Sequence, residues 1–167
     1  RFALAAALLW LAALTAPAPA DQVEYSSTLP IIISPPGLIT VADEDALRAA
    51  FDAANVAGQM PRIELEADIE LTAPLPPLDN PHAGPAVIDG NNHTLNGKLT
   101  GTLLVIGPDT TVSVEQLTLT GGGEYTPEER CGGNVRNEGH LTLRDSRILD
   151  GFASFGGGIC NTGSLRL

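Results

Sequence analysis

Four charged residues close together near the end of the chain are the first candidates for chemistry. Arg144, Asp145, Arg147 and Asp150 fall in one short polar stretch. A pair of carboxylates on one face is what a glycoside hydrolase uses as its acid and its base or nucleophile. Two acids mixed with two arginines are more often a solvated surface with weak ion pairs. We therefore name these four as candidates, and we predict no catalytic, cofactor-binding or metal-binding residue in this chain.

The histidines and cysteines form no recognised catalytic or metal-binding pattern. His93 and His140 fall in turns of different repeats, with no partner in view, and we interpret both as solvated turn residues. Cys131 and Cys160 lack the paired cysteine or histidine ligands that a zinc site needs. The sequence thus predicts no cofactor.

A repeated stretch of sequence predicts the elements that would position these residues. The twelve residues 132–143 occur again at 156–167, 24 positions later, with six of the twelve identical. A fixed period in this range indicates a solenoid, a stack of coils in which each coil buries its apolar face against the next. Equivalent short strands of successive coils then pair, so the sheets are parallel. The repeated glycines fit tight corners and not a phosphate-binding loop, because no helix follows them.

The repeat also predicts which side chains stack. Leu143 should lie beneath Leu167 inside the solenoid, and the preceding leucine of each repeat should do the same. Asn137 and Asn161 occupy one corner of successive coils, where their amides can bond to each other and to backbone groups. We interpret both asparagines as structural.

Two patterns upstream of the repeat predict other elements. Residues 43–55 carry a helix signal, with Asp43 as N-cap and apolar residues at helical spacing. Such a helix would cover the open first coil. Residues 63–71 alternate apolar and acidic, which is the period of a strand. We interpret the acidic positions as a solvated outer face, and a cation-binding strip is the lesser alternative.

The coil length need not be constant. Residues 112–115 correspond to 141–144, which lie 29 positions later. The polar segment 124–130 accounts for the excess over 24 and would loop out, where such insertions often bind ligands. From Val41 to the end, a period of 24 predicts about five coils.

The sequence does not decide whether the two cysteines form a disulfide. In the 24-residue register Cys160 lies beside Arg136, which is five residues past Cys131. Five extended residues span roughly 16 Å, which is well beyond disulfide geometry unless a corner folds the chain back. The register therefore argues against pairing, while a sharp corner would permit it.

The N-terminal part of the chain predicts export. Residues 1–20 combine a positive charge, an apolar run and an Ala-x-Ala site, which is typical of a signal peptide, here clipped at its start. A membrane anchor or a buried helix is the alternative. Residues 21–40, rich in proline, read as a linker or extension. Residues 41–167 read as the β-helix domain, which we expect to be truncated because Leu167 falls inside a strand by comparison with Leu143.

The charge of the chain restricts its partners. Twenty acidic residues stand against nine basic ones, for a formal net charge of −11. This charge repels nucleic-acid backbones and anionic lipids, so we exclude nucleic acid as a partner. No segment after residue 20 is apolar enough to cross a membrane. We expect an exported protein that is either soluble or attached by an unknown anchor.

Two phrases of the sequence resemble a known family. Residues 87–97 and the Gly-Gly-Gly-Ile-Cys-Asn phrase that opens 156–167 resemble secreted bacterial parallel β-helix proteins of the pectin-lyase-like superfamily. They look closest to its non-enzymatic surface members, such as polymorphic outer-membrane proteins and adhesin-like passengers. The resemblance implies a protein that is secreted or held at the bacterial cell surface or outer membrane. Together with the helix signal, the resemblance implies an all-β, right-handed parallel β-helix with about 24 residues per coil and an N-terminal capping helix. Lyases of this fold are expected to use calcium-binding carboxylates with an arginine or lysine base.

Two functions fit these patterns. The leading hypothesis is an exported β-helix domain with a structural, adhesive or carbohydrate-binding role that is not catalytic in this fragment. Its partner would be a cell-surface glycan or a host or cell-surface protein. The alternative is the N-terminal part of a polysaccharide lyase or glycoside hydrolase whose active site lies in further coils. Because one fold hosts both, fold alone does not decide between them.

Overall fold

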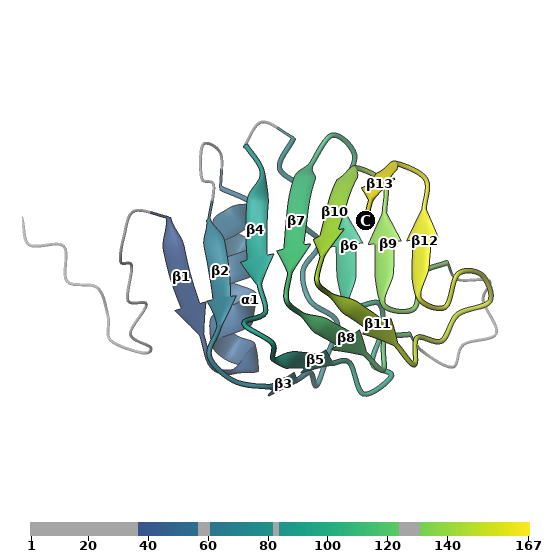
Figure 1. Cartoon of the computed structure of the whole chain (residues 1–167), viewed down its shortest axis with the longest axis horizontal. Helices are drawn as coiled ribbons and strands as arrows, with labels where there is room; N and C mark the ends of the chain where they lie inside the picture. Colours follow the sequence, from purple (N-terminus) through teal and green to yellow (C-terminus); the bar gives the residue numbers. More distant parts are fainter. Residues whose placement is uncertain (1–36, 57–60, 82–83, 124–130) are drawn as a thin grey trace, which may run out of the picture.

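The structure confirms a parallel β-helix. It is a computed structural model that describes residues 37–56, 61–81, 84–123 and 131–167. The predicted signal peptide, most of the predicted linker and the predicted insertion lie outside these ranges. Within the described ranges the chain winds through three sheets in turn, and neighbouring strands of each sheet run parallel (Figure 1).

Thirteen strands and one helix make up the described fold. Sheet A contains, in spatial order, β1 (Leu38–Val41), β2 (Arg62–Leu65), β4 (Ala86–Asp89), β7 (Thr111–Glu115), β10 (His140–Arg144) and β13 (Ser164–Arg166). Sheet B contains β3 (Ile69–Glu70), β5 (Thr94–Asn96), β8 (Thr118–Thr120) and β11 (Arg147–Leu149). Sheet C contains β6 (Leu104–Ile106), β9 (Val135–Asn137) and β12 (Ile159–Asn161). The helix α1 (Glu44–Ala54) follows β1.

Successive coils differ in length. Paired residues on neighbouring strands of sheet A, taken from β1 to β13, are 24, 25, 26, 29 and 24 positions apart. The solenoid has about four turns of about 26 residues. The predicted 24 residues per coil matches the first and last of these separations, and the coils between them are longer. The physical reason is that corners between strands vary in length while the paired strands stay in phase.

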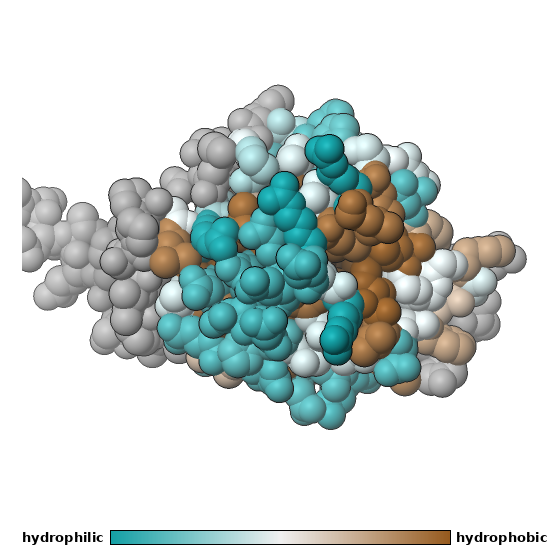
Figure 2. All heavy atoms as spheres, viewed as in Figure 1, coloured by the Kyte–Doolittle hydropathy of each residue, from teal (hydrophilic) through white to brown (hydrophobic). Residues whose placement is uncertain are grey.

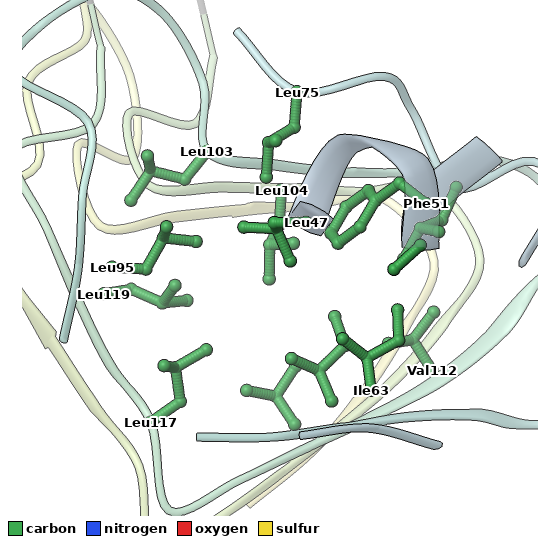
Figure 3. Packing of buried hydrophobic residues seen from close by; sticks show 14 of the residues in the cluster. Leu47, Phe51, Ile63, Leu75, Leu95, Leu103, Leu104, Val112, Leu117 and Leu119 are labelled. Atoms are coloured by element: carbon green, nitrogen blue, oxygen red, sulfur yellow. The ribbon is translucent and has the colours of Figure 1, made fainter. Parts of the chain in front are cut away.

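Side chains at alternate strand positions form the core. Ile63, Ile88 and Val114 are paired neighbours on β2, β4 and β7, and each is at most 2% exposed. Figure 3 shows buried side chains from all three sheets and from α1 pointing into one interior. Each large apolar side chain buried in this way contributes about 1.5–3 kcal/mol. The predicted alternation over 63–71 is confirmed, but a corner at 66–68 divides it into two short strands, β2 and β3.

The predicted helix is confirmed, with its cap. The Asp43 carboxylate accepts a hydrogen bond from the Ala46 N–H at 2.8 Å, and Glu44 and Asp45 lie at the positive end of the helix dipole. The apolar face of α1 is buried in the core through Leu47, Ala50, Phe51 and Ala54. The helix thus takes the place of strands in the first turn. β1 begins at Leu38, so the sheet includes residues that were predicted as linker.

Polar contacts fix both ends of α1 to the next coil. Near its start, the Glu44 carboxylate accepts from the Thr72 N–H and hydroxyl, each at 2.9 Å, and from Arg48. At its end, the Asn80 amide donates to the Ala54 and Val56 carbonyls at 2.9 and 3.0 Å. These bonds satisfy carbonyls that a helix end leaves open.

The predicted asparagine ladder is confirmed. Asn161 pairs with Asn137 in register, and the buried Asn137 amide donates to the Asn161 side chain at 2.5 Å and to the Ser164 carbonyl at 2.8 Å. Its oxygen accepts from the Gly139 N–H at 3.2 Å. The ladder begins only in the later coils, because Ile106 occupies the same register position one coil earlier.

A disulfide joins Cys131 and Cys160, so the argument against pairing was wrong. The register itself is as predicted, since Cys160 pairs with Arg136. However, Gly132 has a φ of 85° and turns the chain back, which places the two cysteine Cα atoms 5.4 Å apart. Gly156, at the equivalent corner, also has a positive φ, of 56°. Glycine is favoured there because a side chain strains this conformation.

The last residue departs from the predicted stacking. Leu141 pairs with Leu165 as predicted, but β13 ends at Arg166 and Leu167 is 89% exposed. Near it lies an apolar hollow of about 430 Å³, whose lining includes Leu143 and Ile148. Apolar side chains (brown) gather beside the polar face in Figure 2.

Replacing Asn137 by alanine should destabilise the protein by about 2 kcal/mol, because the substitution leaves the buried Gly139 N–H and the part-buried Ser164 carbonyl without their partner. Chemical denaturation measures the loss. Asn161→Ala is the matched control, since Asn161 is exposed, and we expect it to cost under about 1 kcal/mol. Equal losses in the two variants would contradict a structural ladder centred on Asn137.

The Glu44 contacts should make helix docking sensitive to acid. Burial raises the pKa of this carboxyl, but hydrogen bonds from Arg48 and Thr72 and the Arg48 charge outweigh burial and lower the pKa overall. Stability from Glu44 is therefore present above the ordinary carboxyl pKa and is lost as pH falls through the lowered one.

Glu44→Gln should reduce stability by about 1 kcal/mol at neutral pH and flatten this acid dependence. Denaturation at a series of pH values tests both effects. Asp45→Asn, an exposed acid of the same helical turn, should leave the profile unchanged. A profile that Glu44→Gln does not alter would contradict the assignment.

Candidate functional site

The four charged candidates do not form one cluster. Arg144 ends β10 on the outer face of sheet A, and Asp145 lies in the corner that follows. Arg147 begins β11, and Asp150 lies at the next corner, where its carboxylate accepts from the Thr120 hydroxyl at 3.5 Å. Asp145 and Arg147 line one cavity together.

That cavity is a polar groove at the corner between sheets A and B, which we call the corner groove. Its volume is about 230 Å³. Its lining consists of Asn92, Gln116, Leu117, Thr118, Asp145 and Arg147. The side chains offer two amides, a hydroxyl, a carboxylate and a guanidinium. These side chains include both hydrogen-bond donors and acceptors. The two charged ones, Asp145 and Arg147, have opposite sign and lie close together in the sequence.

The groove arises from the same left-handed turn in three successive coils. Asn92, Gln116 and Asp145 have φ values of 66°, 49° and 47°. Asparagine and aspartate tolerate this conformation better than most residues. The turns are joined by backbone hydrogen bonds from Asn92 N–H to the Gln116 carbonyl at 2.8 Å and from Gln116 N–H to the Arg144 carbonyl at 3.0 Å. Coils spaced by about 4.8 Å place the first and third of these residues roughly 10 Å apart.

A row of charges crosses the outer face of sheet A beside the groove, and we call it the charged row. Glu64, Asp89, Glu115 and Arg144 are successive register partners on β2, β4, β7 and β10. Figure 2 shows hydrophilic side chains (teal) gathered over this part of the molecule. Sequence reasoning missed the row, because its members lie 25 to 29 residues apart and meet only through the parallel register.

Arginines neutralise part of the charged row. Arg62 contacts the Asp89 carboxylate and lies 3.7 Å from Glu115. On the other side, Arg144 lies 3.5 Å from Glu115. Asp89 and Glu115 are thus held by cations, and this arrangement offsets the repulsion between carboxylates on neighbouring strands.

The histidine interpretation was wrong in two respects, since both histidines have polar partners and one of them does not lie in a turn. The imidazole Nδ1 of His93 lies 3.3 Å from the Asp68 carboxylate of the preceding coil. His140 lies in β10 rather than in a turn, and its Nδ1 lies 2.7 Å from the Ser164 hydroxyl of the next coil. Both partners are 24 or 25 residues away, so no local pattern could show them.

Two kinds of feature are absent from the part of the chain that the structure describes. Within it, no three His, Cys, Asp or Glu side chains are grouped so that they could hold a metal ion. No helix there is long and apolar enough to span a membrane.

Comparison with known proteins adds no assignment. No protein-family model matches the chain, no curated protein is significantly similar to it, and no solved structure matches its fold significantly.

Removing Arg62, which neutralises part of the charged row, should weaken the fold in a salt-dependent way. We expect Arg62→Met to cost up to about 1 kcal/mol at low ionic strength, because Asp89 and Glu115 lose a counter-charge. The loss should shrink in about 1 M salt, where the Debye length is only about 3 Å. Thermal denaturation at two salt concentrations measures it.

Arg166→Met is the control for this experiment. Arg166 occupies the same outward register position on β13, opposite Thr142 and away from the acidic strands. A salt-dependent loss of the same size in both variants would show that the charged row has no specific role in stability.

Proposed function

We propose that this chain is an exported β-helix domain with a non-catalytic, carbohydrate-binding role, and that the corner groove takes the ligand. The observation that carries the proposal is the repetition of polar turn residues Asn92, Gln116 and Asp145 over three coils, with Arg147 beside them. Amides, carboxylates and guanidinium groups hydrogen-bond well to the neighbouring hydroxyls of a sugar. The spacing of the coils lets one glycan chain contact several turns.

Export is supported by the cysteines and by the N-terminal sequence. The Cys131–Cys160 disulfide is typical of proteins from oxidising compartments outside the cytosol. Residues 1–20 have the pattern of a signal peptide. The parallel β-helix is the fold expected from the resemblance to pectin-lyase-like surface proteins, and we propose a place at the bacterial surface or outside the cell on that resemblance.

An enzymatic role is the alternative, and the charged row favours it. Carboxylates and arginines on one sheet are what a polysaccharide lyase or glycoside hydrolase of this fold would need. Against that role, the two central carboxylates Asp89 and Glu115 are each engaged by an arginine. The enzymatic alternative would also hold if the active site lay in further coils.

The proposal is tested by glycan binding. The protein is screened by calorimetry against neutral and acidic oligosaccharides of plant and bacterial walls. We expect binding that weakens at least tenfold, or about 1.4 kcal/mol, in the double variant Asp145→Asn, Arg147→Gln. Asparagine keeps the left-handed turn at position 145, so the substitution changes charge more than backbone.

Arg136→Gln is the matched control. Arg136 is an exposed arginine on sheet C, paired with Glu138 and away from the groove. Binding should survive this change. If no oligosaccharide binds, or if the double variant binds as well as the parent, the groove is not the site. Unsaturated products or new reducing ends during incubation would favour the enzymatic alternative.

A further inference from the structure

The polar side chains of the corner groove have no protein partner within the described part of the chain. On the outer faces of the sheets, charged side chains form ion pairs, such as Lys98 with Glu70 at 2.7 Å and Arg136 with Glu138 at 3.0 Å. With the other described residues, by contrast, five side chains of the groove form no hydrogen bond and no ion pair: Asn92, Gln116, Thr118, Asp145 and Arg147. These five side chains are exposed or half-buried, so a ligand can reach all of them.

The groove side chains repeat along the solenoid axis. Asn92, Gln116 and Asp145 lie at the left-handed turns of three successive coils. Thr118 and Arg147 follow two of these turns and are register partners on β8 and β11. Neighbouring coils are separated by one strand spacing, roughly 4.8 Å. A linear ligand that contacts the same position in each coil must therefore repeat at about this spacing.

The linkage of a glycan decides whether its sugars match that spacing. In a β-1,4-linked chain of glucose or xylose, both bridging bonds are equatorial, so the chain is extended and advances by about one strand spacing per sugar. An α-1,4-linked chain bends and advances less per sugar. Successive sugars of the extended chain present different edges, and an amide can bond to either edge because it has both donors and acceptors. The amides of Asn92 and Gln116 suit this alternation.

The charges around the groove favour a neutral glycan. Within the groove, the Asp145 carboxylate offsets the Arg147 guanidinium. Beside it, the charged row contains the carboxylates of Asp89 and Glu115, and the whole chain has a formal net charge of −11. A polymer of uronic acids brings one carboxylate with every sugar, which one guanidinium over three coils does not neutralise. Such a polymer is repelled by the field of the protein.

We propose that the ligand of the corner groove is an extended, neutral, β-1,4-linked glycan that lies along the solenoid axis with about one sugar per coil. This inference rests on the proposed carbohydrate-binding function of the groove. The turns at Asn92, Gln116 and Asp145 each contact one sugar, and Thr118 and Arg147 add contacts in the last two coils.

Calorimetry with oligosaccharides of defined length tests the proposal on the whole 167-residue chain. The probes are β-1,4-linked oligomers of glucose and of xylose, α-1,4-linked oligomers of glucose, and oligomers of galacturonic acid. We expect affinity in a β-1,4-linked series to rise about fivefold with each added sugar up to three and then to level off. At three sugars, the α-linked and the acidic oligomers should bind at least tenfold more weakly.

Removal of one turn residue should shorten the preferred ligand by one sugar. Asn92→Gly removes the amide at one end of the row, and glycine keeps the left-handed turn. In this variant, affinity should level off at two sugars. Asp109→Gly is the matched control, since Asp109 is exposed and has a φ of 58° but lies in the corner between β6 and β7, outside the groove lining. It should keep the dependence on length of the parent protein.

The outcomes separate this inference from the proposed function. Preferred binding of the α-linked or the acidic oligomers, weakened by the double variant Asp145→Asn, Arg147→Gln, would keep the groove as a glycan site and overturn the proposed linkage or charge. The same levelling-off length in Asn92→Gly and in the parent protein would contradict one sugar per coil. Absence of binding in every series would overturn both proposals. The parent protein decides linkage and charge even if a variant does not fold.

Discussion

Parallel pairing of equivalent strands is the interaction on which the rest of this structure depends. The strands are only two to five residues long, so none of them is stable alone. Each becomes stable because its edge pairs with the equivalent strand of the next coil, in a register that keeps Ile63, Ile88 and Val114 in one buried column. A slip of one residue would turn that column to solvent, so the buried face fixes the register strongly.

The same register builds the outer surface. Residues that alternate with the buried column necessarily face outward. Residues at equivalent positions of successive coils then lie side by side on the surface. The charged row and the corner groove are both products of this rule. Neither needs a special loop, since Gln116 and Asp145 meet because their coils stack in phase. A solenoid therefore produces extended polar surfaces whose side chains recur at the spacing of the strands.

The first turn and the later coils are held together by different contacts. At the first turn, α1 supplies Leu47 and Phe51 in place of strands and is held by hydrogen bonds to the next coil. In the later coils, the apolar position of Ile106 gives way to Asn137 and Asn161, and a disulfide joins the coils nearby. There, directional hydrogen bonds and a covalent link join neighbouring coils.

The sequence by itself determined the repeat, the parallel pairing, the capped helix and the asparagine ladder. These depend on local periodicity and on a phrase repeated at constant spacing, both of which can be read along the chain. Tertiary structure alone decided the disulfide, the partners of His93 and His140, the charged row and the corner groove. Each of these depends on how sharply a corner turns, as at Gly132, and on how many residues the intervening corners contain. Such corners change which distant residues meet without altering the periodicity of the strands.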